Sequence, residues 1–409
     1  MPENYSPNNV DQLLDLIKSG LANESRFSIS GQDTKAGFGY NSNAGINIRM
    51  SSIKGILEYD PAELVMQARA GTPLSDIEEV LSEHEQHLAF EPPNLGLLYN
   101  DNSTSGTIGG AFMANLSGPR RFLAGAARDH ILGVKALSGR GEVYKSGGNV
   151  IKNVTGYDLS KLLTGSWGTL SIVTELSFKV LPAPATSNSI AISGLDVDAA
   201  MDLISRVAQS QLQISGLAFI PASTLENIDC DEFSLEQRDL CLMRLEGSAL
   251  SISERSKALV KLIAGSGNVT NFENEASMSL WQLIRNPHTL LSAGESRCVL
   301  KMSIAPANAK SIIRQLSSFD DCHWYVDAAG AWLWISLSET NAVNHIKTLR
   351  QSLSNGLGSA ILYKAPSHIK QDVGIFSEMS SGLTSLTHRI KDSFDPNHIL
   401  NPDRLYLQQ

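Results

Sequence analysis

The chain has 409 residues, of which 42% are hydrophobic and 18% are charged, and its formal net charge at pH 7 is −9. That length is sufficient for two or three domains with hydrophobic cores, and the composition excludes a wholly disordered chain. The negative charge argues against a nucleic-acid partner, because binding to phosphate backbones needs a basic face.

The N-terminal third alternates predicted helices and strands. Apolar residues at helical spacing predict a helix in VDQLLDLIKSG (10–20). A strand that breaks into a Gly-rich polar loop is predicted in RFSISGQDTKAGFGY (26–40). The next predictions are a strand in AELVMQARAG (62–71), a helix in TPLSDIEEVLSEHEQ (72–86) and a short strand in HLAFEPP (87–93).

Glycine is concentrated between Gly106 and Gly168, where 13 of the 32 glycines of the chain lie. Because glycine is entropically costly in regular structure, the backbone here is expected to turn tightly or to approach another group closely. Between the glycines, the sequence predicts two strands joined by a turn (130–144), a short helix that ends at Gly165 with an Asp158–Lys161 pair, and a strand (168–182).

A change of composition at LPAPATSNS (181–189) predicts a domain boundary. From residue 190 to about 365, predicted strands and helices alternate, which is typical of an α+β domain with an antiparallel sheet. The strands are expected in SIAISGL, LQISGLAFIP, LCLMRLEG, RCVLKMSIAP and WLWISLS, and the helices in DAAMDLISRVAQSQ, SERSKALVKLIAGSG, NAKSIIRQLSSF and TNAVNHIKTLRQSLSN. The tail (377–406) is expected to be an amphipathic helix followed by a turn-rich end.

The cysteines and the N-terminus bear on the cellular compartment. The four cysteines (Cys230, Cys241, Cys298 and Cys322) contain no C-x-x-C pair, which argues against an iron–sulfur cluster and a disulfide framework and fits a reducing compartment. The N-terminus lacks the features of a signal peptide, and no run of about 18 apolar residues predicts a membrane span. We therefore expect a cytoplasmic protein, and peripheral attachment to the inner face of the cell membrane through a complex stays open.

Three stretches could contact a planar, anionic cofactor. In SISGQDTKAGFG (28–39), backbone N–H groups could form an anion-binding nest to which Lys35 adds a positive charge, with a simple surface turn as the alternative. In SGTIGGAFMANLSGPRRFLAGAARDHILGV (105–134), Gly109 and Gly110 would let a cofactor lie in van der Waals contact. The third stretch, GGNVIKNVTGYDLSKLLTGSWGTLSIVTE (147–175), enters a strand whose amides could reach a ring system. Neither a Walker A loop nor a G-x-G-x-x-G turn is present.

The order and spacing of these stretches resemble the FAD-binding domain of the vanillyl-alcohol oxidase and p-cresol methylhydroxylase (PCMH) superfamily, over roughly residues 10–185. The stretches 57–93, 106–135 and 147–170 are similar, more narrowly, to the FAD-binding subunits of bacterial glycolate oxidases, and FDPNHILNPDRL (394–405) resembles the ending of the superfamily. The resemblance implies the α+β class. It implies a two-subdomain PCMH-type FAD-binding domain (1–185), an α+β second domain with an antiparallel sheet and helices (186–365), and a C-terminal helix and tail that return to the FAD domain (366–409).

The resemblance also implies FAD as the cofactor. Carried over residue by residue, the implied contacts are Gly31, Gln32, Asp33, Thr34, Lys35, Thr107, Ile108, Gly109, Gly110, Asn115, Gly118, Asp129, Asn153, Gly156, Asp158, Gly168 and Ile172. Ser171 stands where relatives often have glycine, so a side chain there could tilt the backbone at Ile172. No histidine lies in the first loop, so that loop offers no candidate for a covalent flavin link.

The second domain offers few residues for chemistry on a substrate. Related 2-hydroxyacid dehydrogenases often carry a metal-binding histidine cluster there. In this chain no two histidines beyond residue 185 lie closer than ten residues, and His84 and His87, on a predicted helix, are expected to be solvent-exposed, so no metal site is predicted.

The segment HWYVDAAGAWLWISL (323–337) stands where catalytic machinery is expected, but Asp327 is its only carboxylate. Core packing is expected for Trp332 and Trp334. No catalytic residue is assigned. Arg285 is a candidate to clamp a carboxylate, with a structural salt bridge as an equal alternative.

The resemblance implies an FAD-dependent oxidoreductase that is the FAD-binding subunit of a heteromeric glycolate oxidase or dehydrogenase. Such a complex would oxidise glycolate to glyoxylate and pass the electrons through flavin to a partner. The implied partners are a larger flavin-containing catalytic subunit and an iron–sulfur subunit. Two alternatives stay open: a self-sufficient FAD-dependent 2-hydroxyacid dehydrogenase, and a structural subunit with a vestigial flavin site.

Overall fold

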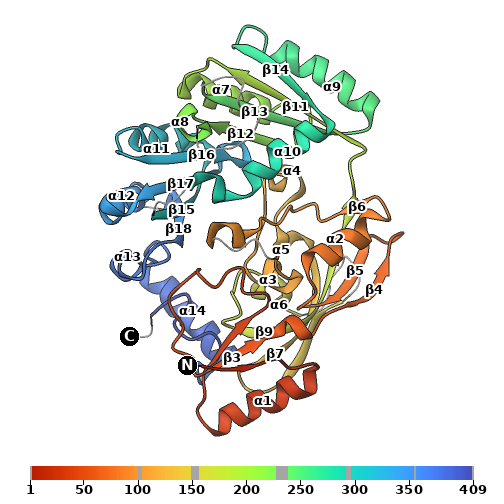
Figure 1. Ribbon diagram of the computed structural model, residues 1–409, viewed down its shortest axis with the longest axis vertical. Helices are drawn as coiled ribbons and strands as arrows, with labels where there is room; N and C mark the ends of the chain where they lie inside the picture. The colour runs from red at the N-terminus through yellow and green to blue at the C-terminus, as the bar shows by residue number, and fades with distance from the viewer. Residues whose placement is uncertain are drawn as a thin grey trace. The chain divides into compact units, whose positions relative to one another are not determined.

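The computed structural model describes residues 2–99, 104–148, 156–226, 238–291, 296–353 and 356–407. The chain divides into two compact units (Figure 1). The first unit consists of Met1–Ser117, Gly125–Ala183 and Glu378–Gln409, and the second of Gly118–Ala124 and Pro184–Ser377.

The first unit contains short helices and three sheets within the described residues. Its helices are α1 (Val10–Ala22), α2 (Leu74–Ser82), α3 (Ile108–Met113), α5 (Ala127–His130), α6 (Leu159–Leu163) and α14 (Ser381–Phe394), with the 3-10 helices η1 (Met50–Ser52) and η2 (Leu95–Tyr99). Its strands are β1 (Glu3–Tyr5), β2 (Phe27–Ser30), β3 (Ile46–Arg49), β4 (Ile56–Asp60), β5 (Val65–Arg69), β6 (Gln86–His87), β7 (Ile131–Ser138), β8 (Val143–Gly147), β9 (Ser171–Lys179) and β10 (Leu181–Pro182).

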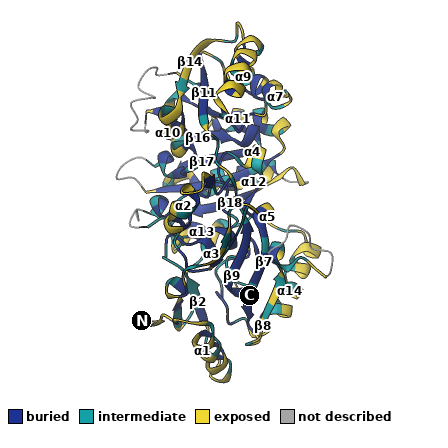
Figure 2. Ribbon diagram, turned by 90° about the vertical axis from the view of Figure 1, so that its right-hand side faces the viewer, coloured by how far each residue is buried: buried dark blue, intermediate teal, exposed yellow. Residues whose placement is uncertain are grey.

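The strand order of these sheets separates a small parallel sheet from a larger antiparallel one. The small sheet has the order β1-β3-β2, the larger sheet has the order β4-β5-β9-β7-β8, and β6 pairs with β10. The central strands β7 and β9 are almost wholly buried, whereas α14 is largely exposed (Figure 2).

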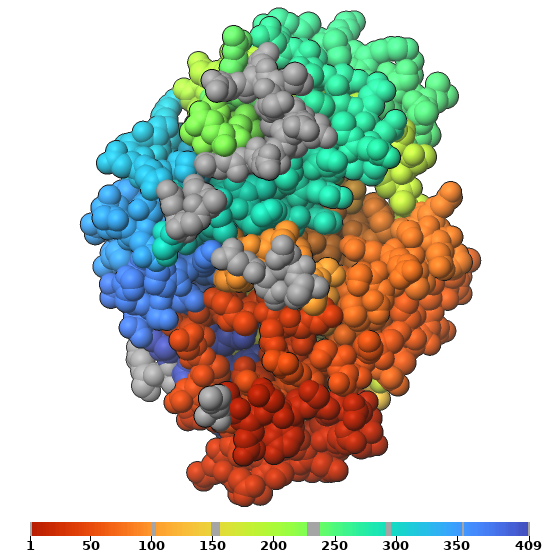
Figure 3. Space-filling model, in the orientation of Figure 1, coloured from red at the N-terminus to blue at the C-terminus, as the bar shows by residue number. Residues whose placement is uncertain are grey.

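The C-terminal tail belongs to the core of the first unit. Ile399 and Leu400 are buried with Leu13 and Ile17 of α1 and with Phe27 of β2. The opposite face of α1 is polar and lies on the surface, where Figure 3 shows the N-terminal residues in red. The amphipathic pattern of α1 therefore fixes this helix against the tail that follows α14.

The second unit contains helices and a single large sheet within the described residues. Its helices are α4 (Arg121–Ala124), α7 (Val197–Ala208), α8 (Ala222–Leu225), α9 (Ala249–Leu262), α10 (Asn274–Arg285), α11 (Ala309–Leu316), α12 (Glu339–Ser352) and α13 (Ser367–Val373), with η4 (Pro287–Leu290), η5 (Pro306–Asn308) and η6 (Ala328–Gly330). Its strands are β11 (Thr186–Ser193), β12 (Gly216–Ile220), β13 (Leu240–Gly247), β14 (Asn268–Glu273), β15 (Arg297–Ile304), β16 (Cys322–Asp327), β17 (Trp332–Ser338) and β18 (Gly358–Lys364).

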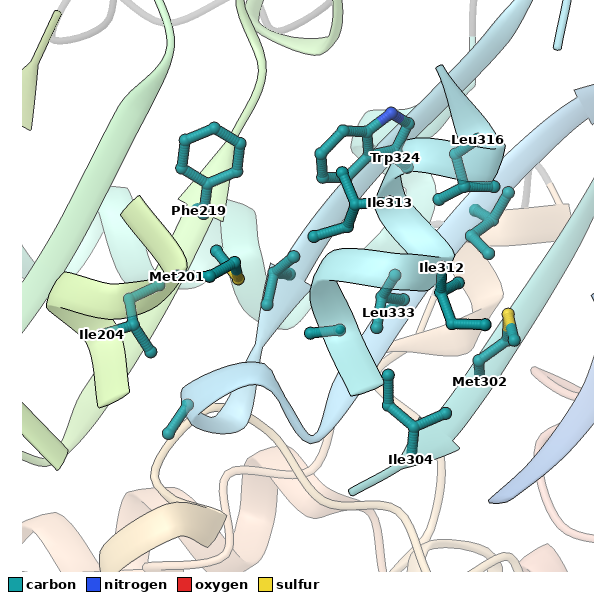
Figure 4. Close-up of a cluster of buried hydrophobic side chains, with 14 of the residues drawn as sticks. Met201, Ile204, Phe219, Met302, Ile304, Ile312, Ile313, Leu316, Trp324 and Leu333 are labelled. Atoms are coloured by element: carbon teal, nitrogen blue, oxygen red, sulfur yellow. The ribbon is translucent and has the colours of Figure 1, made fainter. Parts of the chain in front are cut away.

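This sheet is antiparallel, with the order β14-β11-β13-β12-β16-β17-β15-β18, so the predicted α+β class with an antiparallel second-domain sheet is confirmed. One face of the sheet carries the hydrophobic core with α7 and α11 (Figure 4). Residues drawn there include Met201, Ile204, Phe219, Met302, Ile304, Ile312, Ile313, Leu316, Trp324 and Leu333. Because strand side chains alternate, the intervening residues of β15, β16 and β17 point to the other face.

Some predicted elements are wrong. The strand predicted at 87–93 is only Gln86–His87, which pairs with β10, and the helix predicted at 72–86 ends at Ser82. His84 therefore does not lie on a helix, although it is exposed as expected. The edge strand β14 was not predicted, because its exposed polar residues carry no alternating hydrophobic signal.

The domain boundaries also differ from the prediction. Residues 366–377 lie in the second unit, because Arg350 of α12 donates to the carbonyl oxygens of Val373, Gly374 and Ile375. The segment 118–124 likewise lies in the second unit, because Arg120 donates to Glu246 of β13 through Nε and Nη2, at 2.9 and 2.7 Å. Contacts between side chains far apart in sequence decide both boundaries.

Glu246→Gln is expected to lower the free energy of unfolding at pH 7 by about 3 kcal/mol, because a buried ion pair loses one partner. Burial raises the pKa of Glu246, but Arg244 and Arg120 outweigh burial and hold that pKa well below its usual value. A depressed pKa in the folded state contributes stability above the unfolded pKa of about 4.3, and the contribution is lost as pH falls below it. Urea unfolding followed by tryptophan fluorescence should therefore show the difference from wild type shrinking between pH 5 and pH 3.

The matched control is Glu254→Gln, because Glu254 pairs with Lys257 at the surface. This control should change stability by less than about 0.5 kcal/mol. Two results would contradict a buried ion pair at Glu246. One is an equal loss of stability in the two variants, and the other is a stability difference between Glu246→Gln and wild type that does not depend on pH.

Candidate cofactor cavity

The first unit contains a cavity of about 480 Å³. The loop after β2, the start of α3, the turn before β9 and the C-terminal tail form its walls. Of the residues predicted to contact a cofactor, those that line the cavity are Gly31, Gln32, Asp33, Thr34, Lys35, Thr107, Gly109, Gly110, Gly168 and Ile172. Folding thus brings together three stretches that are separated in sequence by some 60 to 75 residues.

The two adjacent glycines of α3 have different roles. A Cβ atom on Gly109 would lie 2.6 Å from the carbonyl oxygen of Ala70, to which the Gly109 N–H donates at 2.9 Å. The missing side chain of Gly109 therefore serves the packing of α3 against the chain after β5, and because Gly109 also lines the cavity its contact with a cofactor stays a prediction. A Cβ atom on Gly110 would instead face Lys35 Nζ at 3.1 Å and Thr107 Oγ1 at 3.2 Å.

Three cationic side chains line the cavity: Arg49, which pairs with Asp33 at 3.4 Å, and the two cations Lys35 and Arg404. Lys35 is half-buried and donates to Thr34 Oγ1 at 3.0 Å, and Arg404 donates to the Lys35 carbonyl oxygen at 2.8 Å. Burial and, to a smaller extent, the positive charge of Arg404 lower the pKa of Lys35 to about 8, against the opposing effect of Asp33. An anion in the cavity would favour the charged form of Lys35.

Three buried polar atoms around the cavity have no hydrogen-bond partner among the described residues. They are Gln32 Oε1, Ser42 Oγ and Arg404 Nε, and all three residues line the cavity. Because buried polar groups in folded proteins are generally hydrogen-bonded, their presence around one cavity indicates a polar ligand. The glycine wall, the two cations and these atoms fit a large anionic group.

The C-terminal tail holds two walls of the cavity together. Asn401 is buried, its Oδ1 accepts from the N–H of Ile29 at 2.7 Å, and its Nδ2 donates to the carbonyl oxygen of Trp167 at 2.8 Å. One side chain therefore connects the end of β2 to the turn at Gly168. No role was predicted for Asn401 or Arg404 from the sequence, although both lie in the C-terminal stretch that carries the superfamily resemblance.

The indole of Trp167 is fixed by its neighbours. It stacks on the ring of Phe38, with centroids 3.7 Å apart and an interplanar angle of 6°.

The side chain of Ser171, the position where relatives often have glycine, is fully buried, and its Oγ accepts a hydrogen bond from the hydroxyl of Tyr144 at 2.7 Å. Tyr144 of β8 therefore accommodates the Ser171 side chain at the start of β9, and Ile172 still lines the cavity.

The remaining predicted cofactor residues do not line this cavity. Ile108 is buried in the core of the first unit. Asn115 Oδ1 accepts from the N–H of Arg128 at 3.1 Å, and Asp129 Oδ2 accepts from the N–H of Ala126 at 2.8 Å.

Other predicted residues lie elsewhere in the chain. Asp158 is the N-cap of α6 and forms the predicted ion pair with Lys161. Gly118 belongs to the second unit, Gly156 is exposed, and Asn153 lies outside the described residues.

Arg285 lies at the end of α10 in the second unit and is half-buried. Within the described part of the chain it forms no ion pair, and its buried Nε has no hydrogen-bond partner, so the salt bridge considered as its alternative role is not formed there. Across the same residues, no group of three or more His, Cys, Asp or Glu side chains could hold a metal ion.

Comparison with known proteins assigns the family. The family described as "FAD binding domain" matches residues 5–147, and that described as "FAD linked oxidases, C-terminal domain" matches residues 376–405. Glycolate oxidase subunit GlcE of Escherichia coli (strain K12) is 30% identical over 397 residues, which cover 97% of each chain. The chain belongs to the FAD-linked oxidase family.

Other members and solved structures agree with this assignment. Glycolate oxidase subunit GlcD of Bacillus subtilis (strain 168) is 24% identical over 382 residues, covering 88% of this FAD-linked oxidase and 79% of GlcD. The structure of p-cresol methylhydroxylase with substrate bound has a TM-score of 0.73 at 15% identity, covering 99% of this chain and 88% of that one, which shows a shared fold.

Several predictions from the sequence are thereby confirmed. The fold is of the PCMH type, the cofactor is FAD, and the protein is an FAD-dependent oxidoreductase. In the parts of the chain that the structure describes, no helix combines the length and the apolar character that crossing a bilayer requires.

Proposed function

We propose that this FAD-linked oxidase is the FAD-binding subunit of a heteromeric glycolate oxidase that converts glycolate to glyoxylate. The likeness to the GlcE subunit is the observation that carries the proposal, because it extends over 97% of both chains. The proposed partners are a larger flavin-containing catalytic subunit and an iron–sulfur subunit, to which electrons would pass from flavin. Free thiols at Cys241, Cys298 and Cys322 support a cytoplasmic location for the chain.

The cavity of the first unit is the proposed FAD site. Bound FAD supplies the capacity to accept two electrons from a substrate. The loop Gly31–Lys35 and Arg404 would hold the anionic diphosphate, because both cations line the cavity and Arg404 Nε lacks a partner among the described residues. Gly110 would leave room for the cofactor, and Trp167 and Ile172 would provide apolar walls.

A self-sufficient 2-hydroxyacid dehydrogenase is the second candidate function. The observation that favours it is Arg285, whose half-buried guanidinium pairs with no described carboxylate and could hold the carboxylate of a hydroxy acid. In that case the isolated chain would reduce its own flavin with glycolate, and Arg285→Ala would abolish this reduction.

The deciding experiment is the visible absorption spectrum of the purified chain, recorded before and after anaerobic addition of glycolate. We expect a yellow protein that keeps its colour when isolated and bleaches when its partner subunits are co-purified with it. A protein that stays colourless after FAD is added would overturn the proposed cavity. Bleaching of the isolated chain would overturn the need for a partner and favour the second candidate.

A further inference from the structure

Lys301 is a half-buried residue whose ammonium group has no hydrogen bond or ion pair with any described residue. It lies on β15, with Trp334 of β17 as its register partner. Its Nζ lies 3.1 Å from the centroid of the Trp332 ring and 4.9 Å from that of the Trp334 ring. Contact with indole faces offsets part of the cost of removing an ammonium group from water, but it leaves three N–H donors without an acceptor.

A second cation shares the same indole. The guanidinium carbon of Arg121 lies 4.7 Å from the centroid of the Trp332 ring. Arg121 belongs to α4, and the ion pair between its neighbour Arg120 and Glu246 fixes this helix to the second unit. Two cations at one aromatic ring repel each other, and an anion between them would remove that repulsion.

The surroundings fit one negative charge. Asp327 is the register partner of Trp332 and is buried, and its Oδ1 is engaged by the N–H of Ala328 at 2.6 Å. With Lys301 in its ammonium form, the formal charges of Lys301, Arg121 and Asp327 sum to +1, which matches a monoanion better than a dianion. The ring of Tyr363 packs on Trp334 with centroids 5.0 Å apart, so the walls are aromatic and buried.

Core packing was the prediction for Trp332 and Trp334. Both are buried, but they lie on the face of the sheet opposite the hydrophobic core, and their neighbours are cations. Their burial agrees with the prediction, and the cations beside them are contacts that a purely apolar core would not have.

We propose that Lys301 and Arg121 form a binding site for a small monocarboxylate, the class to which 2-hydroxy acids belong. The site would lie on the second unit, and the identity of the acid rests on the proposed function. The ligand carboxylate would accept charge-assisted hydrogen bonds from the Lys301 ammonium and the Arg121 guanidinium.

The binding of a carboxylate at this site is expected to weaken with rising pH. Burial and, to a smaller extent, the positive charge of Arg121 lower the pKa of Lys301 to about 7, against the opposing effect of Asp327. The facing hydroxyl of Tyr363 has a pKa raised to about 12 by burial, so it stays neutral. Because only the ammonium form attracts an anion, carboxylate binding should weaken as pH rises through 7.

The test uses the full chain with FAD bound and saturation-transfer NMR on the methyl protons of acetate, with glycolate as competitor. Lys301→Met is expected to weaken acetate binding at least about tenfold, because a charge-assisted contact is lost. Lys301→Arg should retain binding, and Lys347→Met, which removes an exposed lysine of α12, should leave it unchanged. Acetamide, which is neutral, should not compete.

Three results would overturn the inference. The first is that the wild type shows no saturation transfer to acetate, and the second is that Lys301→Met and Lys347→Met change acetate binding equally. The third is that inorganic phosphate competes with acetate as strongly as glycolate does. If Lys301→Met fails to fold, Arg121→Met provides the same comparison, because Arg121 is exposed and its loss should weaken acetate binding severalfold. FAD content and glycolate-dependent bleaching of the complex are measured separately, so failure of the carboxylate site can be distinguished from failure of the proposed function.

Discussion

Gly110→Val is expected to abolish FAD retention, with a loss of affinity of more than about a hundredfold, because a branched side chain would occupy the wall of the cavity. A Cβ atom at this position lies 3.1 Å from Lys35 Nζ and 3.2 Å from Thr107 Oγ1, so the added methyl groups would have to displace both or extend into the cavity. The measurement is the ratio of flavin absorbance to protein absorbance after purification and after dialysis against free FAD.

Gly382→Val is the matched control, because Gly382 lies in the first turn of α14 as Gly110 does in α3, and no atom lies within 4 Å of the position that its Cβ atom would take. The control should keep its flavin. Normal flavin content in Gly110→Val would place the FAD site elsewhere. Gly109→Val does not test the site, because its side chain would collide with the backbone of Ala70 and destabilise the fold directly.

Asn401→Ala is expected to lower the free energy of unfolding by about 3 kcal/mol and to weaken FAD binding. The substitution leaves the N–H of Ile29 and the carbonyl oxygen of Trp167 without their partner, at about 1–3 kcal/mol for each buried group. Asn401 also has a φ of 43°, a conformation that alanine adopts less readily than asparagine. Urea unfolding would measure the loss of stability, and the flavin absorbance that stays with the protein would measure the weaker FAD binding.

The control for Asn401 is Asn271→Ala, because Asn271 makes one exposed side-chain hydrogen bond, to Glu273. This change should alter stability by less than about 0.5 kcal/mol. If Asn401→Ala retained both stability and flavin, the tail would not be what holds the two walls of the cavity together.

Local sequence patterns predicted the regular elements with strong periodicity. The helix at α1 and the strands β5, β9, β11 and β13 follow from apolar spacing and β-branched content. The exposed strand β14 and the mostly aromatic and apolar strand β16 were missed, because neither alternates between polar and apolar residues. Buried strands such as β11 and β13 were predicted from their β-branched and apolar content, whereas an exposed polar strand such as β14 carries neither that content nor an alternating pattern.

From the sequence, the resemblance carried by short glycine-rich stretches of fixed order predicted the class of the fold and the FAD cofactor, which are confirmed, and it placed the loop 31–35 at the cofactor, which stays a prediction. Only the tertiary structure decided that Gly109 packs on Ala70 whereas Gly110 faces the cavity, and that Asn401 and Arg404 complete its walls. It likewise decided that Lys301 meets Trp332 across neighbouring strands. These contacts join residues far apart in the chain, and their partners are set by strand register and core packing, which no local pattern encodes.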